Sequence, residues 1–125
     1  MNILVVDDNE DFLKFMKESL LQNGYTVITA ADGSEACKLL ERTDIDLIIS
    51  DINMPTLDGI MLHATARELE RYKTTKFIFV SSDGGAYEDV LNLDPDVDFF
   101  FNKMTSIGEL LRFVDNLMVT DFADK

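Results

Sequence analysis

The sequence predicts an α/β fold: a doubly wound, five-stranded parallel sheet with helices on both faces. Two observations lead to this prediction. Short, continuously apolar segments alternate with segments whose apolar residues recur at helical spacing, and this strand–helix order repeats five times. Continuous apolar runs are typical of strands that are buried on both faces of a parallel sheet. The 125 residues suit one domain, which we expect over residues 1–119 with a loose tail at 120–125.

Two strand–helix units are predicted in the first third of the chain. Asn2–Val6 predicts a buried strand, and the β-branched residues of Tyr25–Ala30 predict a second one. Between them, Asp11–Leu21 predicts a helix that ends near Gly24, because glycine suits a helix C-cap. A turn at 32–34 leads into a shorter helix. The apolar residues at helical spacing are Phe12, Phe15, Met16 and Leu20, and then Ala36, Leu39 and Leu40.

The third unit contains the residue on which the prediction of function is built. Asp46–Asp51 predicts a strand that runs from apolar residues straight into an acid, and Pro55 cannot continue it. A helix is expected from Leu57 to about Tyr72. Because ligands bind at the carboxyl ends of strands in open α/β sheets, Asp51 suits a nucleophile or a metal ligand. At this point an ordinary cap of the next turn explains Asp51 equally well.

The last two units complete the sheet. Lys76–Val80 predicts the fourth strand and Asp98–Phe101 the fifth, with a short helix expected between them at about 86–93. The sequence S-I-G-E at 106–109 has the spacing of a capping box. It opens an amphipathic helix that we expect to reach Met118.

The composition excludes several functions. Net charge is −13, with 24 acidic against 11 basic residues, which argues against direct binding to nucleic acid or insertion into an anionic membrane. No apolar run approaches the roughly 20 residues of a membrane helix. The single cysteine, Cys37, forbids an internal disulfide, so we expect a cytoplasmic setting. Cys37 is expected in the core or at its boundary, and the lone His63 at the surface or boundary.

Polar residues follow four of the five predicted strands. Asp7 and Asp8 follow the first strand, Asp51 ends the third, Ser81 follows the fourth and Lys103 follows the fifth. In a parallel sheet these carboxyl ends share one edge. Three acids, a hydroxyl and an amine would therefore meet there.

This set of groups suits phosphoryl transfer. Two carboxylates about 4 Å apart repel by roughly 4 kcal/mol at an effective dielectric near 20, so three need a compensating cation. Oxygen ligands favour Mg²⁺ over zinc. A carboxylate such as Asp51 can attack phosphorus, Lys103 can act as a point charge for phosphoryl oxygens and Ser81 can donate a hydrogen bond to them. Phosphoryl transfer needs mainly positioning and charge neutralisation.

Three pieces of the sequence resemble one known family. The motif ILVVDDN at 3–9, the motif DLIISDINMPTLDG at 46–59 and the single Lys103 resemble receiver domains of bacterial two-component response regulators. The resemblance covers residues 1 to about 119. It implies the flavodoxin-like strand order 2-1-3-4-5. It also implies a phosphorylation-dependent signalling switch, rather than an enzyme that turns over a substrate.

The resemblance implies a role for each matching residue at the acidic edge. Asp51 would be the phosphoacceptor, and Asp7 and Asp8 would hold Mg²⁺ together with Asp51 and the backbone carbonyl of Asn53. Asn53 also matches one of two positions that modulate dephosphorylation in the family. The other such position is Asp83.

The resemblance also implies a set of residues that bind the phosphoryl group and respond to it. Ser81 matches the family's switch hydroxyl and Lys103 its phosphoryl-binding lysine. Ser82 falls where a small residue leaves the phosphoryl pocket open. Phe100 matches a position that often carries tyrosine and changes rotamer when the switch hydroxyl moves, and here its polar contact is lost. Strand alternation sends Phe100 to one face of the sheet and its two phenylalanine neighbours to the other.

Met104 is a departure from the family pattern, which usually has proline after the lysine with a cis bond between them. A cis bond without proline costs roughly 2.5–4 kcal/mol. Either the Lys103–Met104 bond is trans and the loop rearranged, or the surrounding structure holds the strain. We expect a somewhat displaced Lys103.

The resemblance implies partners of two kinds. A sensor histidine kinase or phosphotransfer protein would supply the phosphoryl group. A downstream effector would contact the fifth strand and its flanking helices, at about 86–93 and at the end of the chain. The alternative is a pseudo-receiver, an interaction module that is never phosphorylated. Met104 and Phe100 favour this alternative, and the complete set of acids, serine and lysine opposes it. A Mg²⁺-dependent hydrolase would need a substrate pocket and a second catalytic acid, which we do not find in the loop after Asp51, and a flavin-binding version of the fold is opposed by the acids.

Overall fold

The computed structural model describes residues 1–54, 57–82 and 93–123, and for residues 119–123 the backbone alone. Five parallel strands form one sheet in the order β2-β1-β3-β4-β5. The predicted doubly wound α/β fold is therefore confirmed, including the strand order. The strands are β1 (Asn2–Val6), β2 (Thr26–Ala30), β3 (Leu47–Asp51), β4 (Lys76–Ser81) and β5 (Asp98–Asn102).

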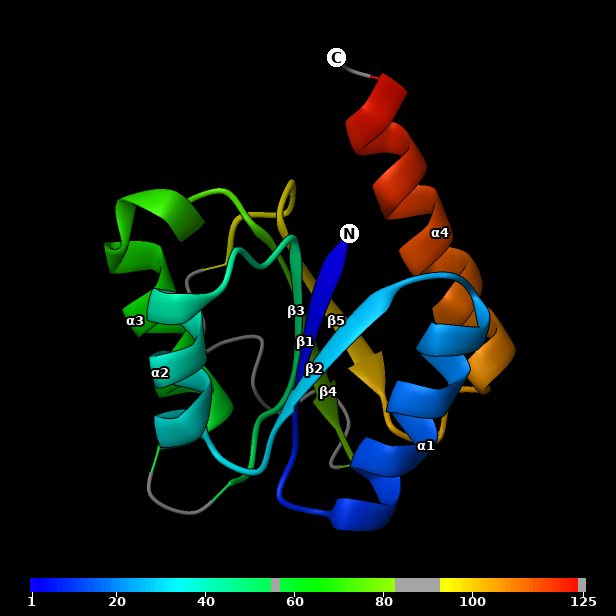
Figure 1. Ribbon diagram of the computed structural model, residues 1–125, viewed down its shortest axis with the longest axis horizontal. Helices are drawn as coiled ribbons and strands as arrows, with labels where there is room; N and C mark the ends of the chain where they lie inside the picture. Colours follow the sequence, from blue (N-terminus) through cyan, green and yellow to red (C-terminus); the bar gives the residue numbers. More distant parts are fainter. Residues whose placement is uncertain (55–56, 83–92, 124–125) are drawn as a thin grey trace.

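Helices cover both faces of the sheet. In Figure 1, α2 and α3 lie on one side of the strands and α1 and α4 on the other. The helices are α1 (Glu10–Gln22), α2 (Gly33–Arg42), α3 (Gly59–Glu68) and α4 (Ile107–Ala123), with a 3₁₀ turn η1 (Glu70–Tyr72) after α3. No helix in the described part of the chain is long and apolar enough to span a bilayer.

Each strand divides its side chains between two cores. Leu4 and Ile48 pack with α2 and α3, whereas Ile3, Val5 and Ile49 pack with α1 and α4. All five residues of β3 are buried, which explains its continuous apolar run and places Asp51 at the end of a rigid central strand. Rigid support of this kind holds a functional side chain in a defined position.

Three helices begin with the same capping device. The side chains of Asn9, Asp32 and Asp58 accept hydrogen bonds from backbone N–H groups three residues later, at 3.1, 2.8 and 2.9 Å. Such caps satisfy N–H groups that have no partner within the helix. At the other end of α1, Gly24 has φ +90°, which glycine adopts without steric cost. The predicted C-terminal signal at Gly24 is thus confirmed.

Two helix boundaries differ from the sequence prediction. The third helix ends at Glu68, before Tyr72, because Leu69 is extended and the chain re-enters a 3₁₀ turn. That turn buries Tyr72, whose hydroxyl lies 2.7 Å from the carbonyl oxygen of Leu40 and 2.6 Å from that of Thr43. At the other end of the chain, α4 extends past Met118 into the expected tail. The helix expected at 86–93 falls almost entirely outside the described residues.

His63 is buried, so its expected place at the surface is wrong. It is 9% exposed on the inner face of α3, and its Nε2 lies 2.8 Å from Asp98 Oδ1. Arg67 donates to the same oxygen at 2.5 Å. The rings of Phe77 and Phe79 lie 5.0 and 5.1 Å from the imidazole, centroid to centroid. A buried carboxylate with two partners thus joins α3 to the start of β5.

Candidate functional site

Three carboxylates meet at the carboxyl edge of the sheet. Asp7, Asp8 and Asp51 each offer one oxygen, and these oxygens all lie within 4.8 Å of one another. Asp7 is fully buried, Asp51 is 6% exposed and Asp8 is exposed. The adjacent strands β1 and β3 deliver these residues, since β1 pairs with β3 up to Val6 and Ser50. The predicted convergence of the acids is therefore present in the structure.

Asp7 is held by the backbone and by one cation. Its Oδ1 accepts a hydrogen bond from the Asn9 N–H at 2.9 Å. Its Oδ2 lies 2.8 Å from the Nζ of Lys103 but receives no hydrogen bond of good geometry from the described residues. A fully buried carboxylate oxygen with spare acceptor capacity suits a metal ligand.

The electrostatics of the site favour a further cation. Burial raises the pKa of Asp51, and the negative charge of Asp7 raises it further, although Lys103 opposes both. Burial lowers the pKa of Lys103, but its close contacts with the carboxylates of Asp7 and Asp51 outweigh burial, so that pKa is raised. Three carboxylates against one ammonium leave two negative charges. A divalent oxygen-seeking ion would compensate them, so the residues present fit Mg²⁺.

Lys103 reaches the acids, so its expected displacement is wrong. Its Nζ lies 3.4 Å from Asp51 Oδ2, and the Lys103–Met104 peptide bond is trans. Two hydrogen bonds hold the loop without proline. The Lys103 N–H donates to the carbonyl oxygen of Ser81 at 3.0 Å, and the Met104 N–H donates to the side chain of Asn102 at 2.8 Å. Met104 itself is 85% exposed and presents its side chain away from the core.

Of the remaining predicted site residues, Ser81 and Asn53 lie beside this cluster. Ser81 is 1% exposed at the end of β4, directly after Val80, which is in register with Asp51. Ser82 is exposed. The backbone of Asn53 hydrogen-bonds Asp51 and acts to lower its pKa. Asp83 lies outside the described residues.

The three phenylalanines of β5 alternate between faces as predicted. Phe100 stacks on Phe79 with ring centroids 5.5 Å apart, on the side of α2 and α3. Phe99 and Phe101 pack against Phe113 of α4 on the other side. Phe100 is partly exposed, and Ser81 is in register with Asn102, two residues after Phe100. Phe100 therefore lies on the strand next to the one that ends at Ser81.

Gly59 keeps the loop after Asp51 close to β3. A Cβ on Gly59 would collide with the carbonyl oxygen of Asp51 and lie 3.0 Å from the Cα of Ile52. The Gly59 N–H also donates to the Ile52 carbonyl oxygen at 2.9 Å. No role for Gly59 is predicted from the sequence above. Its place in the motif that contains Asp51, directly after the helix cap Asp58, is the signal that points to it.

We expect Gly59→Ala to lower the free energy of unfolding by about 2 kcal/mol, because overpacking forces the backbone of Asp51 to shift. Urea unfolding measures this loss. Gly108→Ala is the matched control, since a Cβ there meets nothing within 4 Å. That variant should be neutral or stabilising by up to about 1 kcal/mol. Equal destabilisation by both changes would contradict the packing argument.

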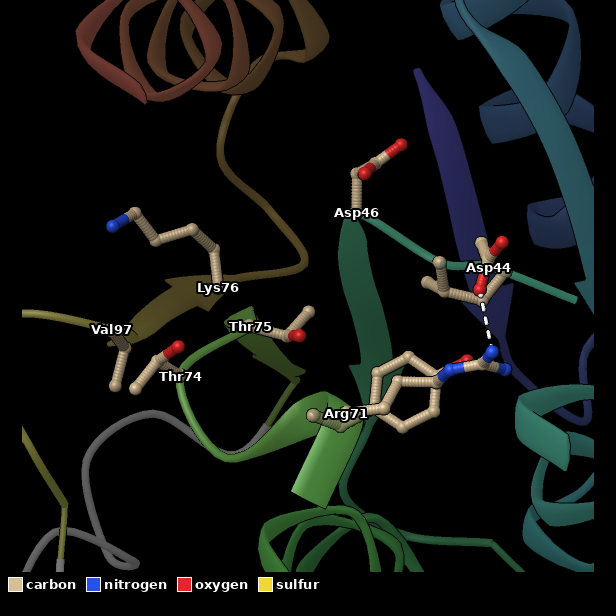
Figure 2. Close-up of a pocket in the computed structure, with 9 residues that line it drawn as sticks. Asp44, Asp46, Arg71, Thr74, Thr75, Lys76 and Val97 are labelled. Atoms are coloured by element: carbon tan, nitrogen blue, oxygen red, sulfur yellow. Dashed lines mark ion pairs between the residues drawn. The ribbon is translucent and has the colours of Figure 1, made fainter. Parts of the chain in front are cut away.

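A broad hollow of about 560 Å³ lies at the opposite edge of the sheet. It is lined by residues that precede β3, β4 and β5, so strand direction places it away from Asp51. Figure 2 shows Arg71 reaching to Asp44 there, at 3.0 Å, with Lys76 at the start of β4. Its charged groups include an exposed ion pair, and its rim holds none of the acids at the carboxyl edge. This hollow and the acidic cluster are therefore separate features of the molecule.

The fold and this acidic edge define a doubly wound α/β protein of the kind found in signalling domains. Solved structures of such domains are similar to this chain. Response regulator protein TrrA from Thermotoga maritima, solved in complex with Mg²⁺–BeF, has a TM-score of 0.81 and 32% identity, covering 93% of this chain and 97% of that one. Chemotaxis protein CheY4 from Vibrio cholerae has a TM-score of 0.84 and 27% identity, covering 92% of this chain and 96% of that one.

Sequence comparison gives the family. Residues 3–115 match the response regulator receiver domain, and the chain belongs to that family. It is 35% identical to the alkaline phosphatase synthesis transcriptional regulatory protein PhoP of Bacillus subtilis, over 86% of this chain and 44% of PhoP. It is 32% identical to the transcriptional regulatory protein PrrA of Mycobacterium leprae, over 93% of this chain and 49% of PrrA. The chain thus spans less than half the length of both relatives.

Proposed function

We propose that this chain is a phosphorylation-dependent switch of a two-component system. A histidine kinase or phosphotransfer protein supplies the phosphoryl group. A carboxylate oxygen of Asp51 attacks its phosphorus, the bond to the donor histidine breaks and an aspartyl phosphate forms. Receiver domains are signalling domains rather than turnover enzymes, so the phosphorylated protein is the product that matters. We expect this to happen in the cytoplasm, with residues 1–119 as the receiver domain.

The observation that carries this proposal is the enclosure of Asp51 by groups of complementary function. Asp51 ends a fully buried strand, with a second buried carboxylate, Asp7, and an ammonium, Lys103, at its side. Asp7, Asp8, Asp51 and the backbone carbonyl of Asn53 would hold Mg²⁺, which would neutralise phosphoryl oxygens when bound. The likeness to TrrA, whose structure contains Mg²⁺–BeF, supports this choice of ion.

The side chains of the protein then position the phosphoryl group and form new contacts with it. Lys103 leaves its contact with Asp7 to pair with a phosphoryl oxygen, while the hydroxyl of Ser81 donates a hydrogen bond to another. Ser82 leaves the entrance open, and Asn53 and Asp83 set how fast water removes the group. These interactions favour one of two arrangements of the β4 end.

The signal leaves through the face around β5. Ser81 is joined to Lys103 by a backbone hydrogen bond, and Phe100 stacks on Phe79 of the neighbouring strand. An inward shift of Ser81 repacks Phe100 and changes the surface of β5 and α4. The predicted segment 86–93 of this face lies almost entirely outside the described residues. A downstream effector protein that binds this surface reads the change.

Incubation with acetyl phosphate tests the proposal. We expect intact mass spectrometry to show one phosphoryl group per chain in the presence of Mg²⁺, and almost none when the ion is removed with EDTA. An established receiver domain under the same conditions is the control. If the control is labelled and this protein is not, the alternative of a pseudo-receiver interaction module replaces the proposal.

A further inference from the structure

The ammonium of Lys103 has an aromatic ring as its third neighbour. Its Nζ lies 2.8 Å from Asp7 Oδ2, 3.4 Å from Asp51 Oδ2 and 4.8 Å from the centroid of the Phe12 ring, over the ring face. A cation within about 6 Å of an aromatic face is attracted by the ring's quadrupole. The side chain of Lys103 is only 20% exposed, so the attraction is less screened than at an open surface.

Two hydrogen bonds from backbone N–H groups to side-chain oxygens link Phe12 to the acidic edge. Asp7 Oδ1 accepts from the Asn9 N–H at 2.9 Å, and Asn9 Oδ1 accepts from the Phe12 N–H at 3.1 Å. The first turn of α1 therefore fixes the backbone of Phe12 relative to Asp7. Each residue thus contacts the next in a closed ring of four: Asp7, Asn9, Phe12 and Lys103.

The loop that carries Lys103 lacks the proline that usually fixes it in receiver domains. Met104 stands where receiver domains usually carry proline, and its exposed side chain gives the lysine loop no support from the core. Hydrogen bonds to Ser81 and Asn102 hold the backbone of the loop, as described above. They do not hold the long, flexible lysine side chain. The ring of Phe12 and the two carboxylates do so.

We propose that Phe12 is a positioning residue for phosphoryl transfer. Its ring holds the ammonium of Lys103 above Asp51 and shields one side of it from water. When a phosphoryl group arrives, the ammonium moves from Asp7 to a phosphoryl oxygen without leaving the ring face. This role goes beyond core packing and rests on the proposed function of Asp51 as phosphoacceptor.

Substitutions at position 12 separate positioning from packing. Phe12→Leu keeps an apolar side chain but removes the ring, whereas Phe12→Tyr keeps the ring. Phe15→Leu makes the same change on the same helix at a residue that is 50% exposed, and it serves as the matched control. We expect Phe12→Leu to slow labelling by acetyl phosphate and Mg²⁺ about three- to tenfold. Phe12→Tyr and Phe15→Leu should remain near the wild-type rate.

A second measurement does not depend on phosphorylation. The ring of Phe12 should shift the NMR resonances of the Lys103 ε-methylene group upfield in the unphosphorylated protein. We expect this shift to disappear in Phe12→Leu and to persist in Phe12→Tyr and Phe15→Leu. A mere loss of helix stability would not give this pattern.

The outcomes distinguish this inference from the function on which it rests. Wild-type rates in Phe12→Leu, or unchanged Lys103 resonances, would overturn the role of Phe12 and leave Asp51 as phosphoacceptor. An equal slowing in Phe15→Leu would also overturn it. A wild-type protein that cannot be labelled would overturn the proposed function, and the role of Phe12 with it.

Discussion

Asp51→Asn is expected to abolish phosphorylation. The amide that replaces the carboxylate is neutral and a poor nucleophile, so no aspartyl phosphate can form at this position. After incubation with acetyl phosphate and Mg²⁺, intact mass spectrometry should detect only the unmodified variant. The wild-type protein should gain one phosphoryl group under the same conditions. This is the largest effect on function that the account predicts.

Asp58→Asn is the matched control for that experiment. Asp58 lies on the same loop and caps α3, accepting a hydrogen bond from the Met61 N–H at 2.9 Å. Asparagine caps helices as well as aspartate does, so this variant should fold and be labelled normally. Labelling that survives in Asp51→Asn, or that is lost equally in both variants, would contradict the assignment of Asp51.

The largest expected loss of stability comes from Asp98→Asn. The Asp98 side chain is 2% exposed and bonded to Arg67 at 2.5 Å and His63 at 2.8 Å. Its Oδ2 also accepts a hydrogen bond from the Asp94 N–H at 2.9 Å. Removing the charge leaves its partners buried without compensation. We expect urea unfolding to show a loss of about 3 kcal/mol.

An exposed ion pair provides the control for this change. Arg71 and Asp44 lie 3.0 Å apart, with side chains 51% and 82% exposed. Exposed pairs of this kind contribute little, so Asp44→Asn should change the free energy of unfolding by less than about 0.5 kcal/mol. If the two asparagine variants lost similar stability, the Asp98 cluster would not be a buried anchor.

The effect of Asp98→Asn should also depend on pH. Burial acts to raise the pKa of Asp98, but the Asp94 N–H, Arg67 and His63 outweigh it, so that pKa is lowered in the folded protein. A lowered pKa contributes stability that is present above the unfolded-state value, about 3.9, and is lost as pH falls through the folded-state value. The wild-type protein should therefore exceed the variant in stability at neutral pH and approach it in acid. A difference that stays constant down to about pH 3 would contradict this linkage.

The acidic edge could be predicted because strand direction alone determines it. Once Val6, Asp51 and Val80 were placed at strand ends, parallel pairing required the polar residues there to meet. Lys103 was predicted in the right place but with the wrong displacement. The displacement was inferred from the missing proline alone, whereas hydrogen bonds to Asn102 and to the carbonyl of Ser81 hold the trans loop.

Contacts between distant segments could not be predicted in this way. His63 and Asp98 are 35 residues apart, and helical periodicity says only that position 63 lies on a helix. Likewise, periodicity predicted that Phe12 lies on the apolar face of a helix, but it could not show that its ring lies over the ammonium of Lys103. The end of the third helix was missed because burial of Tyr72 against α2 overrides a helical pattern that is locally continuous.

Titration with Mg²⁺, followed by amide NMR shifts, shows whether a single metal site lies beside Asp51. We expect shifts concentrated at Asp7, Asp8, Asp51 and Asn53, which saturate with one ion per chain and are lost in Asp7→Asn. Because the chain carries a net charge of −13, diffuse attraction of cations is the competing explanation. Small shifts spread over the acidic surface, unaffected by Asp7→Asn, would contradict the account.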